Sequence, residues 1–155
     1  MATDAKKAEN RVKMYQMIIT GMALGIWDLI GETAKAISPK IGEQLLMIAE
    51  KEAGFELAGE TPEHILTELG RLYVDEIGGA SAAELEVDGN ELSLKLRDAP
   101  SSELLRPFKA AGVEPFFEPV TCIGLAALAR IGKRARVSLE AWEEGKGGIV
   151  HFELV

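Results

Sequence analysis

The sequence contains little cysteine and has an excess of negative charge. Its 155 residues include one cysteine, Cys122, which excludes a disulfide within the chain and fits a reducing cytosol. Asp and Glu number 25 against 17 Lys and Arg, which gives a net charge of −8 without any basic stripe. Because an acidic surface repels phosphate backbones and anionic lipid headgroups, nucleic acid and anionic membranes are not expected partners.

Long hydrophobic runs are also missing. The most apolar stretch, residues 17–30, is shorter than the roughly 20 residues that span a bilayer, and Asp28 lies inside it. The first ten residues are polar and mixed in charge, unlike a secretory signal peptide. We therefore expect a cytoplasmic protein with no membrane span, in which residues 17–30 form a buried helix.

The sequence lacks the usual signatures of enzymes. Its densest glycine cluster, residues 145–148, lies in a predicted hairpin turn rather than between a strand and a helix, so it does not match a dinucleotide-binding fingerprint. Nucleophile and base do not occur at a spacing typical of covalent catalysis. The sequence thus gives no support for an enzyme, and we expect no cofactor.

The first half of the chain is predicted to be helical, because apolar residues recur there at helical spacing. The pairs Ser38-Pro39 and Thr61-Pro62 suit the cap and first turn of a helix. Gly54 suits the end of the helix between them. The predicted helices cover residues 6–37, 40–53 and 61–77.

The second half alternates between apolar and polar residues in two places, as exposed strands do. Residues 83–97 form one predicted hairpin around Asp88-Gly89-Asn90, and residues 134–155 form the other. Short helices are predicted over residues 101–111 and 122–132. The chain is therefore expected to be one domain, residues 1–155, of the α+β class, with N-terminal helices packed on one face of an antiparallel sheet made of two β-hairpins.

The last third of the chain resembles a known family. Pro119–Leu128, Val137–Ala141 and His151–Val155 are similar to the 4-vinyl-reductase-type domain, also called the hydrocarbon-binding domain, and to its relatives among the transport-protein-particle (TRAPP) subunits. The resemblance implies an α+β domain that often pairs through its helices and, in several relatives, encloses an apolar cavity for an acyl or other hydrophobic ligand. Many members carry two cysteines around the last hairpin turn, where this chain has Trp142 and Val150, so a metal or redox role is not implied here.

Few polar side chains are candidates for chemistry. Cys122 begins a predicted helix, whose N-terminus favours a thiolate, so it is either a reactive or acylated thiol or a small buried side chain. His64 and Glu68 share a helix face and could contribute to a metal site or simply be solvated. His151 is predicted to point outward beside Glu153 on the last strand. We expect no metal site.

The first helix has an internal carboxylate and several glycines. Asp28 is either a functional buried carboxylate or part of the polar stripe of an amphipathic helix. Gly21, Gly25 and Gly31 each cost roughly 1 kcal/mol relative to alanine in a helix interior. Their presence indicates a close backbone approach, to another helix of the chain, to a second subunit or to a ligand, and we expect a homodimer.

Apolar residues from two parts of the chain form a candidate ligand site. Phe116 and Phe117 lie in a proline-braced segment that leads to Cys122, and flexible methionines in the first helix suit varied ligands. The candidate ligand-binding residues are Met22, Trp27, Phe116, Phe117 and Cys122, although a filled core would use them equally well. We predict a non-catalytic binding or sensor domain for a small hydrophobic, acyl- or hydrocarbon-like, ligand. A ligand-free structural homodimer is the alternative.

Overall fold

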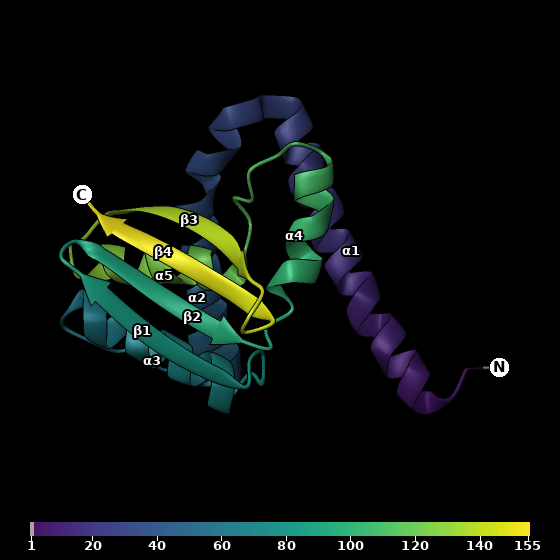
Figure 1. Ribbon diagram of the computed structural model, residues 1–155, viewed down its shortest axis with the longest axis horizontal. Helices are drawn as coiled ribbons and strands as arrows, with labels where there is room; N and C mark the ends of the chain where they lie inside the picture. Colours follow the sequence, from purple (N-terminus) through teal and green to yellow (C-terminus); the bar gives the residue numbers. More distant parts are fainter. Residues whose placement is uncertain (1) are drawn as a thin grey trace.

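The computed structural model describes residues 2–155, except for the side chains at 101 and 102. A four-stranded antiparallel sheet forms one layer, and helices cover one of its faces (Figure 1). This arrangement confirms the predicted α+β class. The elements are α1 (Asp4–Ile30), the 3-10 helix η1 (Gly31–Ile37), α2 (Ser38–Ala53), α3 (Pro62–Asp75), β1 (Ala82–Asp88), β2 (Glu91–Arg97), α4 (Ser101–Ala110), α5 (Pro119–Arg130), β3 (Ala135–Trp142) and β4 (Gly147–Leu154).

The two predicted hairpins are both present and join through their inner strands. The strand order is β1-β2-β4-β3, so that β2 and β4 form the centre of the sheet. Within the first hairpin Asp88 pairs with Glu91, and at the centre Leu94 pairs with Val150. Because side chains alternate along a strand, the leucines of β2 all face the helices.

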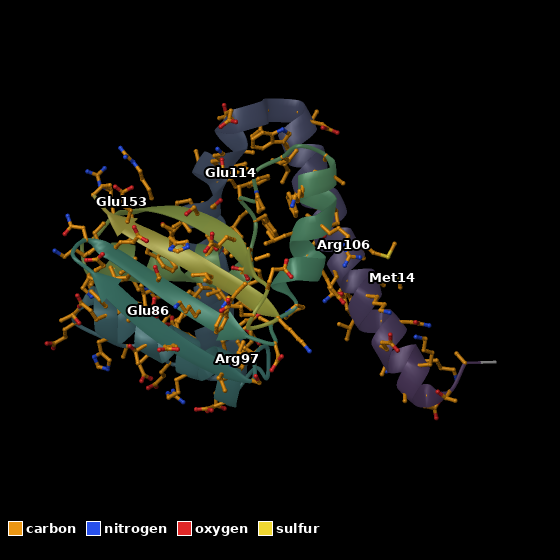
Figure 2. All side chains as sticks on the ribbon, in the orientation of Figure 1. Met14, Glu86, Arg97, Arg106, Glu114 and Glu153 are labelled. Carbon is orange, nitrogen blue, oxygen red and sulfur yellow. The ribbon has the colours of Figure 1, made fainter. Side chains whose placement is uncertain are left out.

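The main core lies between this inner face and the helices α2, α3 and α5. Leucines of the central strand pack with Phe152 of β4 and with Leu66 and Leu128 of the helices, all of them fully buried. The opposite face of the sheet carries charged side chains. Figure 2 shows Glu86, Arg97 and Glu153 spread over it. The core is therefore one-sided, as the sequence alternation indicates.

The helix ends follow the predicted chemistry in two cases and depart from it in a third. The Thr61 side chain accepts a hydrogen bond from the backbone N–H of His64 at 3.2 Å, and Gly54 ends α2 in the left-handed conformation at φ 69°. Ser38, however, does not cap α2. Its hydroxyl donates instead to the carbonyl oxygen of Phe116, because the fold places the irregular segment between α4 and α5 against the start of α2.

The first helix differs from its prediction in length and in burial. It ends at Ile30, because Gly31 adopts φ 56° and turns the chain into η1, so the expected uninterrupted helix to residue 37 is wrong. The expected burial of residues 17–30 is also wrong, since Ala23 is the buried residue of α1. Figure 1 shows α1 lying beside α4 and extending away from the sheet towards the N-terminus.

A second, smaller apolar cluster holds α1 against the rest of the protein. Ala23 and Trp27 of α1 pack there with Phe108 of α4 and with Phe116 of the segment before α5. The cluster lies outside the main core. It fixes the C-terminal half of α1, whereas residues 4–15 of α1 are exposed throughout.

Candidate functional site

The structure brings together three of the five residues predicted to bind a ligand. The rings of Trp27 and Phe116 stack with centroids 5.9 Å apart, and Phe117 meets Phe116 edge-on at 6.5 Å. Phe108 closes the group from α4 at 6.5 Å from Phe116. These rings contact one another and fill the second cluster. Ligand binding by them stays a prediction.

The other two predicted residues lie elsewhere. Met22 is 60% exposed and points away from the aromatic cluster, on the open side of α1. Cys122 is 1% exposed and lies in α5 where this helix packs against α2. Gly42 of α2 approaches so closely that an added Cβ would overlap the carbonyl oxygen of Cys122.

Cys122 is a protonated thiol in an apolar environment. Burial raises its pKa to about 12, and the negative charge of Glu118 acts in the same direction. Its sulfur lies 3.9 Å from the carbonyl oxygen of Phe116. Since the thiolate is the reactive form, this environment favours the small buried side chain over the reactive thiol.

The segment from Pro115 to Thr121 separates two hollows. On one side is an open cleft of about 330 Å³, which we call the Lys35 cleft, between η1, α5 and the inner face of β3. Its wall includes Phe116, Leu125, Val137 and Leu139, with Lys35 at its edge. The buried hydroxyl oxygen of Thr121, which also lies in this wall, has no hydrogen-bond partner among the described residues.

On the other side is a smaller and more enclosed cavity of about 180 Å³, which we call the Glu118 cavity. It lies between α1, α4 and the end of the segment before α5. Its wall is largely apolar and includes Ile19, Tyr73, Leu104, Phe108, Phe117 and Glu118.

Glu118 is a buried carboxylate that the sequence analysis missed. It is 7% exposed and caps α5, where it accepts a hydrogen bond from the backbone N–H of Thr121 at 2.8 Å. Burial raises the pKa of Glu118, although the N–H groups of Val120 and Thr121 partly oppose this. Burial also raises the pKa of Tyr73 to about 12, with a further contribution from the charge of Glu118. The sequence signal was the acidic residue directly before Pro119, a helix start.

The open side of α1 carries a regular row of exposed apolar positions. Tyr15, Ile18, Met22, Gly25 and Leu29, which we call the α1 stripe, follow one another at alternating intervals of three and four residues. Leu29 is 85% exposed, and the other large members are all at least half exposed. Figure 2 shows the neighbouring Met14 extending from α1 on the side away from the sheet. This spacing places the five positions on one face of the helix.

The glycines of α1 do not pack within the chain. A Cβ added at Gly21 or Gly25 would meet nothing within 4 Å, so these two positions face open space. Gly31 is explained by its positive φ. Tight packing within one chain therefore does not account for Gly21 and Gly25.

By length and composition alone, the helical stretch of residues 4–53 is apolar enough to cross a membrane. Its most apolar window has a mean hydropathy of 1.2, and 11% of that window is buried. Asp28, which lies in the same helix, is exposed, as expected for a polar stripe. Most of the apolar surface of α1 is thus exposed.

The remaining histidines lie on the surface. His151 faces outward from β4, as predicted, with Nδ1 2.8 Å from the Ser93 hydroxyl and Nε2 3.3 Å from Glu140. His64 is exposed, and Glu68, which shares its helix face, pairs with Arg71 at 2.9 Å. Within residues 2–155, His, Cys, Asp and Glu side chains do not form a group able to hold a metal ion.

Comparisons with known proteins identify the fold. No protein-family model matches the chain, and no curated protein sequence does. Among solved structures, it is similar to the crystal structure of a trafficking protein particle complex subunit 3 from Naegleria fowleri covalently bound to palmitic acid. The match covers 95% of this chain and 96% of that one, at a TM-score of 0.55 and 10% sequence identity. The chain therefore has the fold of a TRAPP subunit.

Proposed function

We propose that this protein is a non-catalytic scaffolding and binding module that works as a homodimer paired through α1. The α1 stripe is the observation that carries this proposal. Burial of one large apolar side chain contributes roughly 1.5–3 kcal/mol. Burial of several exposed side chains of the stripe would therefore strongly stabilise an associated state. A stripe on one helix is self-complementary, since the same positions meet across a two-fold axis.

The glycines support a second copy as the partner of α1. Gly25 lies inside the stripe and Gly21 borders it, and neither is filled by its own chain. Small residues let two helix backbones approach closely, which explains why α1 tolerates their cost in helix stability. A membrane is the competing partner. The exposed Asp28 and the net charge of −8 favour protein over anionic lipid.

The test is the oligomeric state across a concentration series by analytical ultracentrifugation. We expect a dimer for the natural chain and a monomer for Ile18→Glu, which places a charge within the stripe. Ile77→Glu is the matched control, because Ile77 is equally exposed but lies beyond α3; it is expected to remain dimeric. A monomeric natural chain, or one that binds neutral lipid vesicles instead, would contradict the proposal.

A second function, storage of an apolar ligand, is favoured by the Lys35 cleft. Its wall combines the incompletely covered side chains of β3, a cation at the edge and the unpartnered Thr121 hydroxyl. An acyl chain with a carboxylate fits this set, with the chain against Val137 and Leu139 and the carboxylate at Lys35, where it would replace Glu32 or Glu114, which pair with Lys35 in this structure. The similar TRAPP subunit carries palmitic acid covalently, whereas the buried, protonated Cys122 favours a non-covalent ligand here.

Native mass spectrometry of the purified protein tests this second function. Retention of an added decanoate on the natural chain, and its loss in Val137→Trp, would support it. If the natural chain shows neither a bound acyl chain nor a thermal shift, the protein is the ligand-free scaffold. We also propose that the protein acts as a sensor, that it belongs to the 4-vinyl-reductase-type family and that it is located in the cytoplasm.

A further inference from the structure

The Glu118 cavity combines an apolar wall with one buried charge. Ile19 of α1, Leu104 and Phe108 of α4 and Phe117 provide apolar surface, and Glu118 is the charged residue of the wall. A ligand pocket of this kind, mostly apolar with few polar groups, fixes the orientation of what it binds through those groups. The chemistry of Glu118 therefore decides which ligands suit the cavity.

The carboxylate of Glu118 is only partly compensated by the protein. Moving an ionised carboxylate out of water is expensive unless it is paired and hydrogen-bonded. The N-terminus of α5 supplies the hydrogen bond from Thr121 at 2.8 Å and the positive end of the helix dipole, equivalent to roughly half a charge. Among the described residues, lysine, arginine and histidine side chains do not pair with Glu118.

A cationic group placed in the cavity would complete this compensation. An ammonium group supplies the missing charge and donates charge-assisted hydrogen bonds to a carboxylate. A fatty-acid carboxylate in the same place would be repelled instead. The cavity of about 180 Å³ equals the volume of about six water molecules at about 30 Å³ each. This is roughly the volume of a short alkyl chain with its head group.

We infer that the Glu118 cavity binds a small apolar amine in its protonated form, with the ammonium group at Glu118 and the hydrocarbon part against Ile19, Leu104 and Phe117. This site is separate from the Lys35 cleft and takes ligands of the opposite charge. It also goes beyond the proposed pairing of α1, which does not require a ligand.

Three probes of equal length separate the effect of the head group from that of the chain. Hexylamine, hexanol and hexanoate are titrated into the full-length protein by calorimetry near pH 7, where the amine is fully protonated. We expect saturable binding of hexylamine with a Kd below about 1 mM, and at least about tenfold weaker binding of hexanol and, in this cavity, of hexanoate. The comparison of hexylamine with hexanol needs no variant, so it can be read even if substitution of Glu118 prevents folding.

Two variants then locate the site. Glu118→Gln keeps an oxygen that can accept from Thr121 and removes the charge, so it is expected to bind hexylamine no better than hexanol. Glu103→Gln is the control, because Glu103 is an exposed carboxylate on α4; it is expected to bind like the natural chain. Leu104→Trp fills the cavity and is expected to abolish binding of hexylamine and hexanol, and any hexanoate that still binds to it is assigned to the Lys35 cleft, which Leu104 does not line.

Other results would overturn the inference. These are equal or tighter binding of hexanoate that Leu104→Trp abolishes, binding of hexylamine that Glu118→Gln leaves unchanged, and no binding of hexylamine. Repeating the titration on the monomeric Ile18→Glu variant separates this inference from the proposed function, because the cavity lies on the side of α1 opposite the stripe. If Ile18→Glu is monomeric and still binds hexylamine, the inference holds independently of the dimer. If the natural chain is a dimer but does not bind hexylamine, the inference fails and the proposed dimer stands.

Discussion

Gly42 of α2 lies directly against the backbone of Cys122 in α5. The carbonyl oxygen of Cys122 occupies the space that a Cβ at position 42 would need. These two helices share more contacts than any other pair of elements, so this point fixes how closely they pack. The position of the Cys122 backbone therefore requires glycine at position 42.

Substitution of Gly42 tests this relationship. Because the obstructing atom belongs to the backbone, it cannot rotate away, and Gly42→Ala is expected to destabilise the protein by about 1–3 kcal/mol or more. Gly25→Ala in the Ile18→Glu background is the matched control, since position 25 is open and alanine favours a helix by about 0.5–1 kcal/mol. Urea unfolding measures both. Equal effects in the two variants would contradict the predicted contact.

The thiol of Cys122 is expected to be inert and to make stability sensitive to alkali. A maleimide should label the folded protein far more slowly than the urea-unfolded protein near pH 7. The folded pKa of about 12 exceeds the ordinary value of 9.0, so the folded state holds the proton more tightly. The stability contribution is thus complete below pH 9 and is lost as pH rises from 9 towards 12.

Comparison with Cys122→Ala isolates this effect, because Tyr73 titrates over an overlapping range. The difference in unfolding free energy between the natural chain and the variant is expected to shrink steadily from pH 9 to pH 11. A difference that stays constant over this range would show that the thiol is not protected in the folded state.

Glu118 is expected to make the protein less stable as pH rises from acid towards neutral. Burial raises its pKa above the value of 4.5, so between these two pKa values the folded state binds more protons than the unfolded state. The carboxyl group is therefore accommodated best below pH 4.5, and stability falls as pH rises through the folded pKa.

Glu118→Gln removes this titration. Thermal unfolding from pH 4 to pH 7 is expected to give a difference between the natural chain and the variant that moves in favour of the variant as pH rises. Glu103→Gln should track the natural chain throughout. If the Glu118→Gln difference does not depend on pH, Glu118 is not the group that senses acid.

Arg97 and Trp142 form the main aromatic contact on the exposed face of the sheet. The Arg97 guanidinium lies 4.9 Å from the centre of the indole ring, and Lys95 lies 5.9 Å from it. Arg97→Ala is expected to cost about 0.5–1 kcal/mol in unfolding free energy, as is usual for cation–π contacts at exposed sites. Arg134→Ala, at an exposed position before β3, should change stability less; an equal loss would argue against the contact.

The sequence predicts the hairpins well because their information is local. A period of two and the turn at Gly89 determine both the register and the inner face, and Leu94 is buried where the alternation places it. The same holds for the Thr61 cap. Ser38 was predicted equally from local chemistry but bonds to Phe116, because the tertiary fold offers a buried carbonyl that no nearby residue reveals.

The candidate site was less predictable for the same reason. Apolar residues at helical spacing in α1 signal burial, but they do not say whether the same chain or a second one covers them, and Met22 proves to be exposed. Among 25 acidic residues, Glu118 differs from the others through what surrounds it in three dimensions. The aromatic residues at 27, 116 and 117, predicted together as ligand-binding residues, are neighbours in the structure, and their role in binding stays a prediction.

The charged edges of the sheet determine how far association can proceed. β1 and β3 are the outer strands, and their exposed positions include Glu84, Glu86, Arg136 and Glu140. Charged side chains on an edge strand oppose the addition of further strands from other molecules. If two copies of α1 pair across a two-fold axis, the α1 stripe of each copy is buried by the other copy and is not available to a third. The assembly then closes on itself at two members instead of growing into a fibre.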